Sequence, residues 1–131
     1  MAKVDYRALR DYMSTVLTES PDGTYDLESG EPVDFSGKKF YQVSFQTTQT
    51  DTEMSSQEFN KTVEMLKRET KSRVYLGKFD GNVELSFAAK NRKLAMEIAK
   101  RFNQHSIWDW KSGDLILNDY FNKDTNIILN Y

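Results

Sequence analysis

The stretch Arg73-Val-Tyr-Leu-Gly-Lys-Phe-Asp-Gly-Asn-Val-Glu-Leu-Ser-Phe87 decides the fold. Apolar and polar residues alternate on both sides of Asp80-Gly81, as in two β-strands that each bury one face. Asp-Gly between such runs predicts a two-residue hairpin turn, because glycine adopts positive φ freely. The implied register places Lys78 opposite Val83 and Leu76 opposite Leu85. One face is then apolar, with Val74, Leu76, Val83, Leu85 and Phe87, and the other carries Tyr75, Gly77, Phe79, Asn82, Glu84 and Ser86.

A helix and a strand are predicted on either side of this hairpin. Ser55-Ser56-Gln57-Glu58 is a capping box that starts a helix over residues 55–70, with Met54 and Phe59 as a hydrophobic staple. A second helix is expected over 91–103, and strands over 39–48, 105–110 and 115–117. The order strand, helix, strand, strand, helix, strand predicts an α+β fold with a ferredoxin-like split βαβ core, βαββαβ, and an antiparallel sheet.

The ends of the chain are predicted to add elements to this core. Residues 4–17 have the apolar spacing of an amphipathic helix, and residues 126–131 favour a C-terminal edge strand. One of these additions is expected to cover an edge or the open face of the sheet. We therefore expect a single domain over 1–131. It comprises an N-terminal helix with an acidic, turn-rich segment (1–37), the core (38–117) and a tail (118–131).

Composition excludes several classes of site. The chain has 131 residues, no cysteine and one histidine, which excludes disulfides, thiolate metal sites and sites that need two imidazoles. No stretch approaches the length of a membrane-spanning helix, and the N-terminus lacks the apolar run of a signal peptide. We expect a cytoplasmic protein that has no membrane partner.

Charge is unevenly distributed along the chain. Residues 11–60 hold ten acidic and two basic residues, whereas the chain as a whole has a net charge of −2. Such asymmetry can focus a negative field on one side of a small protein. It predicts binding to a basic protein surface, such as one that normally holds nucleic acid; the alternative is a solvated acidic loop. The expected partner-binding residues are Asp22, Asp26, Glu28, Glu31, Asp34, Asp51 and Glu53.

Aromatic residues on the open sheet face support an alternative function. RNA-recognition domains stack bases on rings in this position, so the chain could bind single-stranded nucleic acid. The candidate rings for stacking, or for a protein interface, are Phe40, Tyr75, Phe79, Trp108 and Trp110. The net negative charge and the absence of the aromatic-rich motif of that family favour the protein-binding hypothesis.

Signals for catalysis are isolated. His105 and Asp109 lie four residues apart on a predicted strand, and Glu84 lies on the outer face of the hairpin. A histidine and a carboxylate can move a proton or bind a metal, but a lone strand residue is more often structural. The sequence contains no phosphate-binding loop, nucleophile elbow or metal-ligand spacing. We therefore expect no enzymatic activity, no cofactor and no catalytic or metal-binding residues.

Two short motifs carry a family resemblance. Glu84-Leu85-Ser86-Phe87 and Asn103-Gln104-His105-Ser106-Ile107-Trp108 resemble segments of small phage and mobile-element proteins over residues 73–117. Some members of that group inhibit host defence, among them anti-CRISPR proteins. The resemblance implies an inhibitor that binds a nucleic-acid-binding effector through an acidic surface, in the cytoplasm of the host cell.

Overall fold

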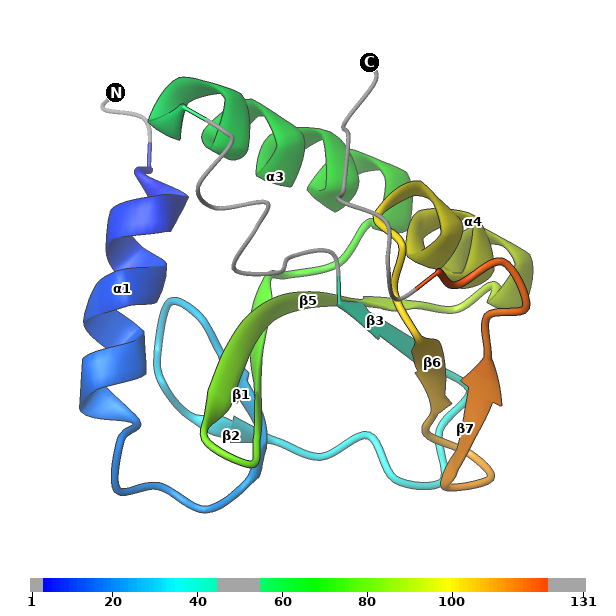
Figure 1. Ribbon diagram of the computed structural model, residues 1–131. Coiled ribbons are helices and arrows are strands. Elements are labelled where there is room, and N and C mark those ends of the chain that lie inside the picture. Colours follow the sequence, from blue (N-terminus) through cyan, green and yellow to red (C-terminus); the bar gives the residue numbers. More distant parts are fainter. Residues whose placement is uncertain (1–3, 45–54, 123–131) are drawn as a thin grey trace.

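The computed structural model describes residues 4–44 and 55–122. Within these residues the chain forms an α+β fold with three helices and one antiparallel sheet of seven strands (Figure 1). The helices are α1 (Tyr6–Val16), α3 (Ser56–Thr70) and α4 (Arg92–Arg101). The strands are β1 (Gly23–Asp26), β2 (Pro32–Val33), β3 (Tyr41–Ser44), β4 (Tyr75–Phe79), β5 (Asn82–Ala89), β6 (Ser106–Asp109) and β7 (Asp114–Leu117).

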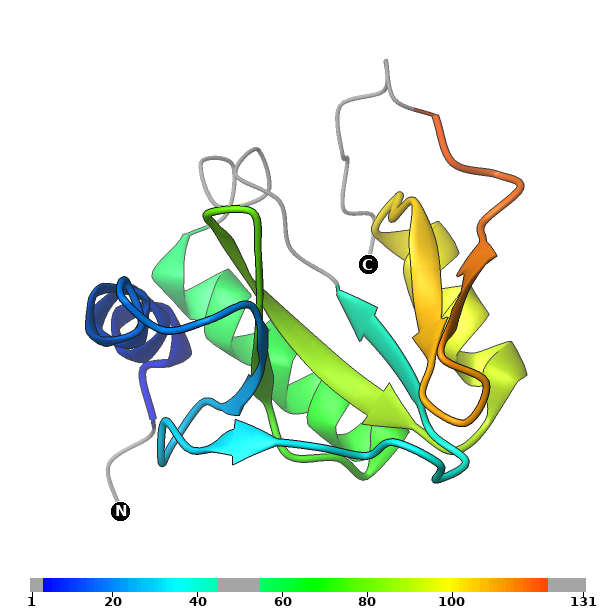
Figure 2. The same ribbon diagram turned by 90° about the horizontal axis from the view of Figure 1, so that it is seen from below.

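The sheet has the strand order β2-β1-β4-β5-β3-β6-β7. Helices α3 and α4 cover one face, and Figure 2 views the sheet from the opposite, open side, with α3 behind it. Side chains that alternate along each strand therefore divide between a helix-covered core and an open face. The core includes Val43, Leu76, Leu85, Phe87 and Ile107, each at most 1% exposed.

The predicted hairpin is confirmed with its register. Leu76 lies opposite Leu85 and Lys78 opposite Val83. Both turn residues have positive φ, 50° at Asp80 and 79° at Gly81, as a type I′ turn requires. The hairpin thereby places one apolar face on the helices and a mainly polar face on the open side.

Side-chain caps start the helices near the predicted positions. The Ser55 hydroxyl accepts a hydrogen bond from the backbone N–H of Glu58, 3.1 Å away, which confirms half of the capping box. Asn91 caps α4 in the same way, and Asp5 caps α1. The helices begin within two residues of the predicted positions, 4, 55 and 91.

Helix α1 packs beside α3, on the helix-covered side of the sheet. The Tyr6 backbone N–H donates to the Asn60 side chain at 2.8 Å, and the Tyr6 hydroxyl donates to Glu64 at 2.7 Å. Lys67 donates to the same hydroxyl at 2.9 Å. Helix α1 therefore does not cover the open face.

Three of the predicted features fall partly or wholly outside the described residues. The strand predicted over 39–48 is observed as β3 up to Ser44, and its second half lies beyond the described part. The C-terminal strand predicted over 126–131 and the staple residue Met54 also lie outside it. Strands β1 and β2 form a short hairpin that adds an edge next to β4.

Candidate functional site

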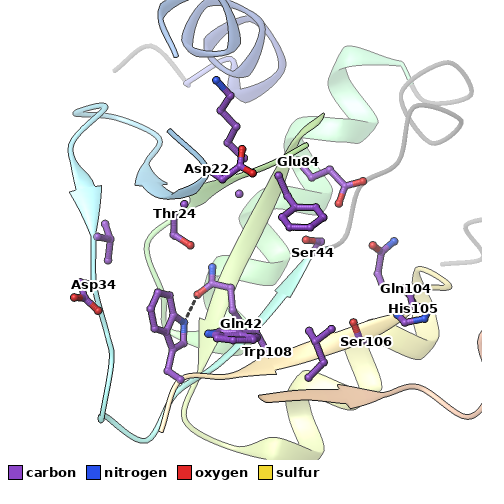
Figure 3. Close-up of a pocket in the computed structure, with 17 residues that line it drawn as sticks. Asp22, Thr24, Asp34, Gln42, Ser44, Glu84, Gln104, His105, Ser106 and Trp108 are labelled. Carbon is purple, nitrogen blue, oxygen red and sulfur yellow. Dashed lines mark hydrogen bonds between the residues drawn. The ribbon is translucent and has the colours of Figure 1, made fainter. Parts of the chain in front are cut away.

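A groove of about 870 Å³ lies on the open face of the sheet (Figure 3). The hairpin of β1 and β2 borders it on one side, and strands β6 and β7 border it on the other. Its floor comes from β3, β4 and β5, with Gln42, Ser44, Gly77 and Glu84 among the lining residues. The groove joins segments that are far apart in the sequence.

Strand register explains why these side chains meet. Thr24 lies opposite Gly77, which lies opposite Glu84, so the three residues form one row across the open face. Gly77 has no side chain, and this leaves the row open between Thr24 and Glu84. A second row runs from Gln42 through Trp108 to Leu115. These two rows supply carboxylate, amide and indole groups to one cavity.

Three of the five predicted aromatic residues are occupied by contacts within the protein. The Phe35 ring lies 4.8 Å from that of Phe40, and it meets Tyr75 and Trp110 edge-on at 5.7 and 5.6 Å. Tyr75 is only 7% exposed. The connection between β2 and β3, which carries Phe35, thus covers the rings that α1 or the tail was expected to cover.

A buried amide fixes the indole of Trp110. The Gln42 side-chain oxygen accepts a hydrogen bond from Trp110 Nε1 at 3.1 Å, and its nitrogen donates to the Ser86 hydroxyl at 2.7 Å. Both Gln42 and Ser86 are buried. A satisfied polar network of this kind holds the floor of the groove in one arrangement.

Besides Trp110, two other predicted aromatic residues, Trp108 and Phe79, line the groove. The Phe79 side chain is 76% exposed at the end of β4. No contact between these two rings and another aromatic ring is found among the described residues. They remain accessible to a ligand.

The charged groups that face the groove are acidic. Asp22, Asp34 and Glu84 line it, and Figure 3 shows them on three sides of the cavity. The lining lysine, Lys78, donates its ammonium hydrogens to the carbonyls of Leu17, Thr18 and Ser20 at 2.6–2.8 Å. The Lys78 ammonium therefore binds the end of α1 and does not neutralise the carboxylates of the groove.

Glu84 is the most enclosed of these acids. Burial raises the pKa of Glu84 above its ordinary value, and a hydrogen bond from Ser44 opposes this effect. Among the described residues, no lysine or arginine lies within 4 Å of the Glu84 carboxylate, and the sequence of residues 45–54 contains neither. A half-buried carboxylate without a cationic partner is costly when ionised.

The other described acidic residues that were predicted to bind a partner do not line the groove. Asp26 forms an ion pair with Arg73 at 2.5 Å and accepts hydrogen bonds from the backbone of Glu28 and Ser29. The hydrogen bond from Arg73 lowers the pKa of Asp26. Glu28 lies 3.4 Å from the same arginine. Glu31 is exposed. Asp51 and Glu53 lie outside the described residues.

His105 and Asp109 have separate environments. His105 lines the groove, with its ring 5.3 Å from that of Phe121. The Asp109 carboxylate accepts hydrogen bonds from the backbone of Lys111 and Ser112 in the turn before β7. Over residues 4–44 and 55–122, no three histidine, aspartate or glutamate side chains gather as metal ligands would.

Part of the groove lining could be predicted from the sequence. The sequence placed Glu84 on the open face, and it named Asp22, Asp34, Phe79 and Trp108 for different reasons. It missed Gln42 and Ser44 as lining residues, although both fall on the polar side of the predicted strand. It gave no signal that β1 pairs with β4, and this pairing brings Asp22 to the groove that Glu84 also lines.

Comparison with known proteins gives no relative. No family model, no curated protein and no solved structure matches the chain. No helix in the described part of the chain is both long and apolar enough to cross a membrane.

Proposed function

We propose that the chain is a protein-binding module whose groove accepts a positively charged segment of another protein. The observation that carries this proposal is the Glu84 carboxylate, which is half-buried in the groove and has no cationic partner among the described residues. An arginine or lysine side chain from a partner would supply the missing charge. Charge-assisted hydrogen bonds of this kind are among the strongest in proteins.

The remaining groove residues suit the same ligand. Asp22 and Asp34 add negative charge near the rim, and Trp108 offers an indole ring. Tryptophan is the best aromatic partner for a cation, especially a guanidinium. Ser106 supplies a hydroxyl group that could hydrogen-bond to a peptide backbone. The groove thus combines charge, an aromatic surface and polar groups.

The partner in this proposal is a basic surface that normally contacts nucleic acid. Such surfaces are rich in arginine and lysine because they neutralise phosphates. An effector of a host defence system, which the family resemblance implies, carries a surface of this kind, and inhibition would follow from its occlusion. We place this interaction in the cytoplasm.

Single-stranded nucleic acid is a second candidate ligand, favoured by one observation. Trp108 and the exposed ring of Phe79 lie on the open face of an antiparallel sheet, where base stacking would be possible. Three carboxylates in the same groove would repel the phosphates. The protein ligand is therefore the proposal, and the oligonucleotide becomes an arm of its test.

The test is a fluorescence-anisotropy titration with a short, labelled peptide of alternating arginine and threonine. We expect Glu84→Gln to weaken binding by roughly tenfold, because one charge-assisted hydrogen bond contributes about 1.5 kcal/mol. Glu97→Gln makes the same chemical change on an exposed site of α4 and should leave the affinity unchanged. Binding should also weaken as ionic strength rises.

Three results would overturn the proposal. The peptide could fail to bind, Glu84→Gln could bind it as tightly as the unmodified chain, or a labelled oligothymidylate could bind more tightly than the peptide. The last result, with loss of binding on Trp108→Ala, would favour the nucleic-acid alternative.

We also propose that the centre of the fold is a ferredoxin-like core. Its support is the central strand order β4-β5-β3-β6, with α3 connecting β3 to β4 and α4 connecting β5 to β6. Both connections cross over the same face, and β5 lies between the parallel strands β3 and β4. On this interpretation α1, the hairpin of β1 and β2, and β7 are additions to the core, and the hairpin and β7 form walls of the groove.

A further inference from the structure

The two outer edges of the sheet differ in how open they are. Strand β2, at one edge, has only two residues, and one of them is Pro32, which has no backbone N–H. Short strands and proline are two of the ways in which proteins protect an edge from pairing. Strand β7, at the other edge, has four residues and no proline. Its Leu115 and Leu117 side chains are 57% and 60% exposed.

Hydrogen-bond alternation shows which backbone groups of β7 face outward. The Asn118 N–H donates to the His105 carbonyl at 2.9 Å, so these residues form a hydrogen-bonded pair next to the β6–β7 ladder. Such pairs alternate with non-hydrogen-bonded ones in antiparallel strands. In the register that sets Ile107 opposite Ile116, the N–H and C=O groups of Leu115 and Leu117 therefore point away from β6.

The other side of β6 has a consistent alternation. The Trp110 N–H donates to the Phe40 carbonyl at 3.0 Å, and Trp108 lies opposite Gln42. The N–H and C=O groups of Trp108 therefore point toward β3. Trp108 forms no backbone hydrogen bond with Leu115, its neighbour on β7. Over residues 4–44 and 55–122, no group pairs with the outward N–H and C=O groups of Leu115 and Leu117.

We propose that β7 pairs antiparallel with β7 of a second copy of this chain, about a two-fold axis through Ile116. Leu115 of one copy then lies opposite Leu117 of the other, and both residues point their backbone groups outward. Each copy supplies two donors and two acceptors, so the pairing forms a regular ladder without a bulge. The edge is self-complementary, as a two-fold interface requires. This inference is independent of the groove's ligand.

Side chains agree with the same register. On the open face, Leu115 and Leu117 of the two copies form two apolar cross-strand pairs, which stabilise antiparallel strands. Asp114 lies opposite Asn118, so no like charges face each other. Leu115 also lines the groove. The two grooves would therefore lie on one continuous open face and could bind a partner that carries two basic segments.

Sedimentation equilibrium over a concentration series tests the pairing. We expect the mass-average mass of the unmodified chain to rise from 15.3 kDa toward twice that value. Leu115→Pro removes an N–H that points outward and leaves the ladder between β6 and β7 intact, so this variant should remain at the monomer mass. Leu117→Lys adds a charge at the pairing edge and should act in the same way if the proline variant is unstable.

Cross-linking tests the register. The chain has no cysteine, so a single introduced thiol can form a disulfide only between two copies. Residues opposite each other in a non-hydrogen-bonded antiparallel pair have Cα atoms close enough for a disulfide. Ile116→Cys should form a covalent dimer under mild oxidation, whereas Ser112→Cys, in the exposed turn, should not.

Each outcome decides the proposal. A mass of 15.3 kDa at every concentration would overturn the pairing of two copies. Residues 123–131 of the same chain, or a strand from another protein, would then be the alternative partners of β7. Dimers that persist in both Leu115→Pro and Leu117→Lys would show that the copies meet elsewhere. Equal cross-linking of Ile116→Cys and Ser112→Cys would refute the two-fold through Ile116.

Discussion

Substitution of Lys78 by methionine tests how α1 is attached to the sheet. The Lys78 ammonium donates hydrogen bonds of 2.7, 2.8 and 2.6 Å to the carbonyls of Leu17, Thr18 and Ser20. These carbonyls follow the last turn of α1, where the helix dipole is negative. Methionine keeps most of the aliphatic length of lysine and removes every donor. The substitution therefore isolates the contribution of the ammonium group.

The magnitude follows from these contacts. The three carbonyls are exposed or partly buried, so water can replace the lost donors, and each bond contributes about 0.5–1 kcal/mol. The favourable charge–dipole interaction adds about 0.3–1 kcal/mol. The free energy of unfolding should fall by about 2–4 kcal/mol. For a domain of this size the melting temperature should fall by roughly 10 °C.

Urea denaturation, followed by circular dichroism, measures this loss. With an m-value of about 2 kcal/mol/M, the midpoint should move down by about 1–2 M. Lys61→Met removes the same charge from an exposed position on α3, and its effect should stay within about 0.5 kcal/mol. Equal midpoints for the two variants would refute the argument that Lys78 anchors α1.

Two other substitutions test the core and the acidic turn. Leu76→Ala should cost about 2–5 kcal/mol in urea denaturation, because Leu76 is fully buried. Val16→Ala, at a position that is 53% exposed on α1, should cost little, and similar losses for the two variants would contradict the assigned core. Asp26→Asn should lower the melting temperature at pH 7 by a few degrees. The pKa of Asp26 is lowered in the folded state, mainly by the hydrogen bond from Arg73. The ionised side chain therefore stabilises the fold above the ordinary carboxyl pKa of 3.8, and this stabilisation is lost as pH falls through the folded-state pKa. Thermal melts from pH 7 to pH 2 should therefore show a smaller acid-induced loss for Asp26→Asn, and identical pH profiles would contradict the ion pair.

Local signals made the centre of the fold predictable. The turn at Asp80-Gly81 needs two residues of positive φ, and few residue pairs other than Asx-Gly adopt this conformation at low cost. The Ser55 cap depends only on its own helix. Hydrophobic alternation then assigned each strand face. These features act over a few residues, so no knowledge of distant contacts was needed.

Distant pairing made the candidate site hard to predict. Asp22 reaches the groove because β1 pairs with β4, more than 45 residues later in the chain. Strand β1 has four residues and β2 has two, which is too short for a clear alternation. Phe35 covers Tyr75 and Trp110 from a connection without periodic signal. The sequence therefore identified residues of the groove without showing that they meet.

Ionisation of Glu84 has opposite effects on stability and on the proposed function. Burial raises the pKa of Glu84 in the folded state, so folding favours its protonated form and its ionised form destabilises the fold. This cost is absent below the ordinary carboxyl pKa of 4.5 and appears as pH rises through the folded-state pKa.

Glu84→Gln should therefore raise the melting temperature at pH 7, while it weakens binding of the basic peptide. Asp22 is exposed, so Asp22→Asn should weaken binding without the gain in stability. A site retained for binding carries such a cost, whereas a purely structural carboxylate would not. If Glu84→Gln lowers both the melting temperature and the affinity, the side chain supports the fold and the groove loses its central cation-binding group.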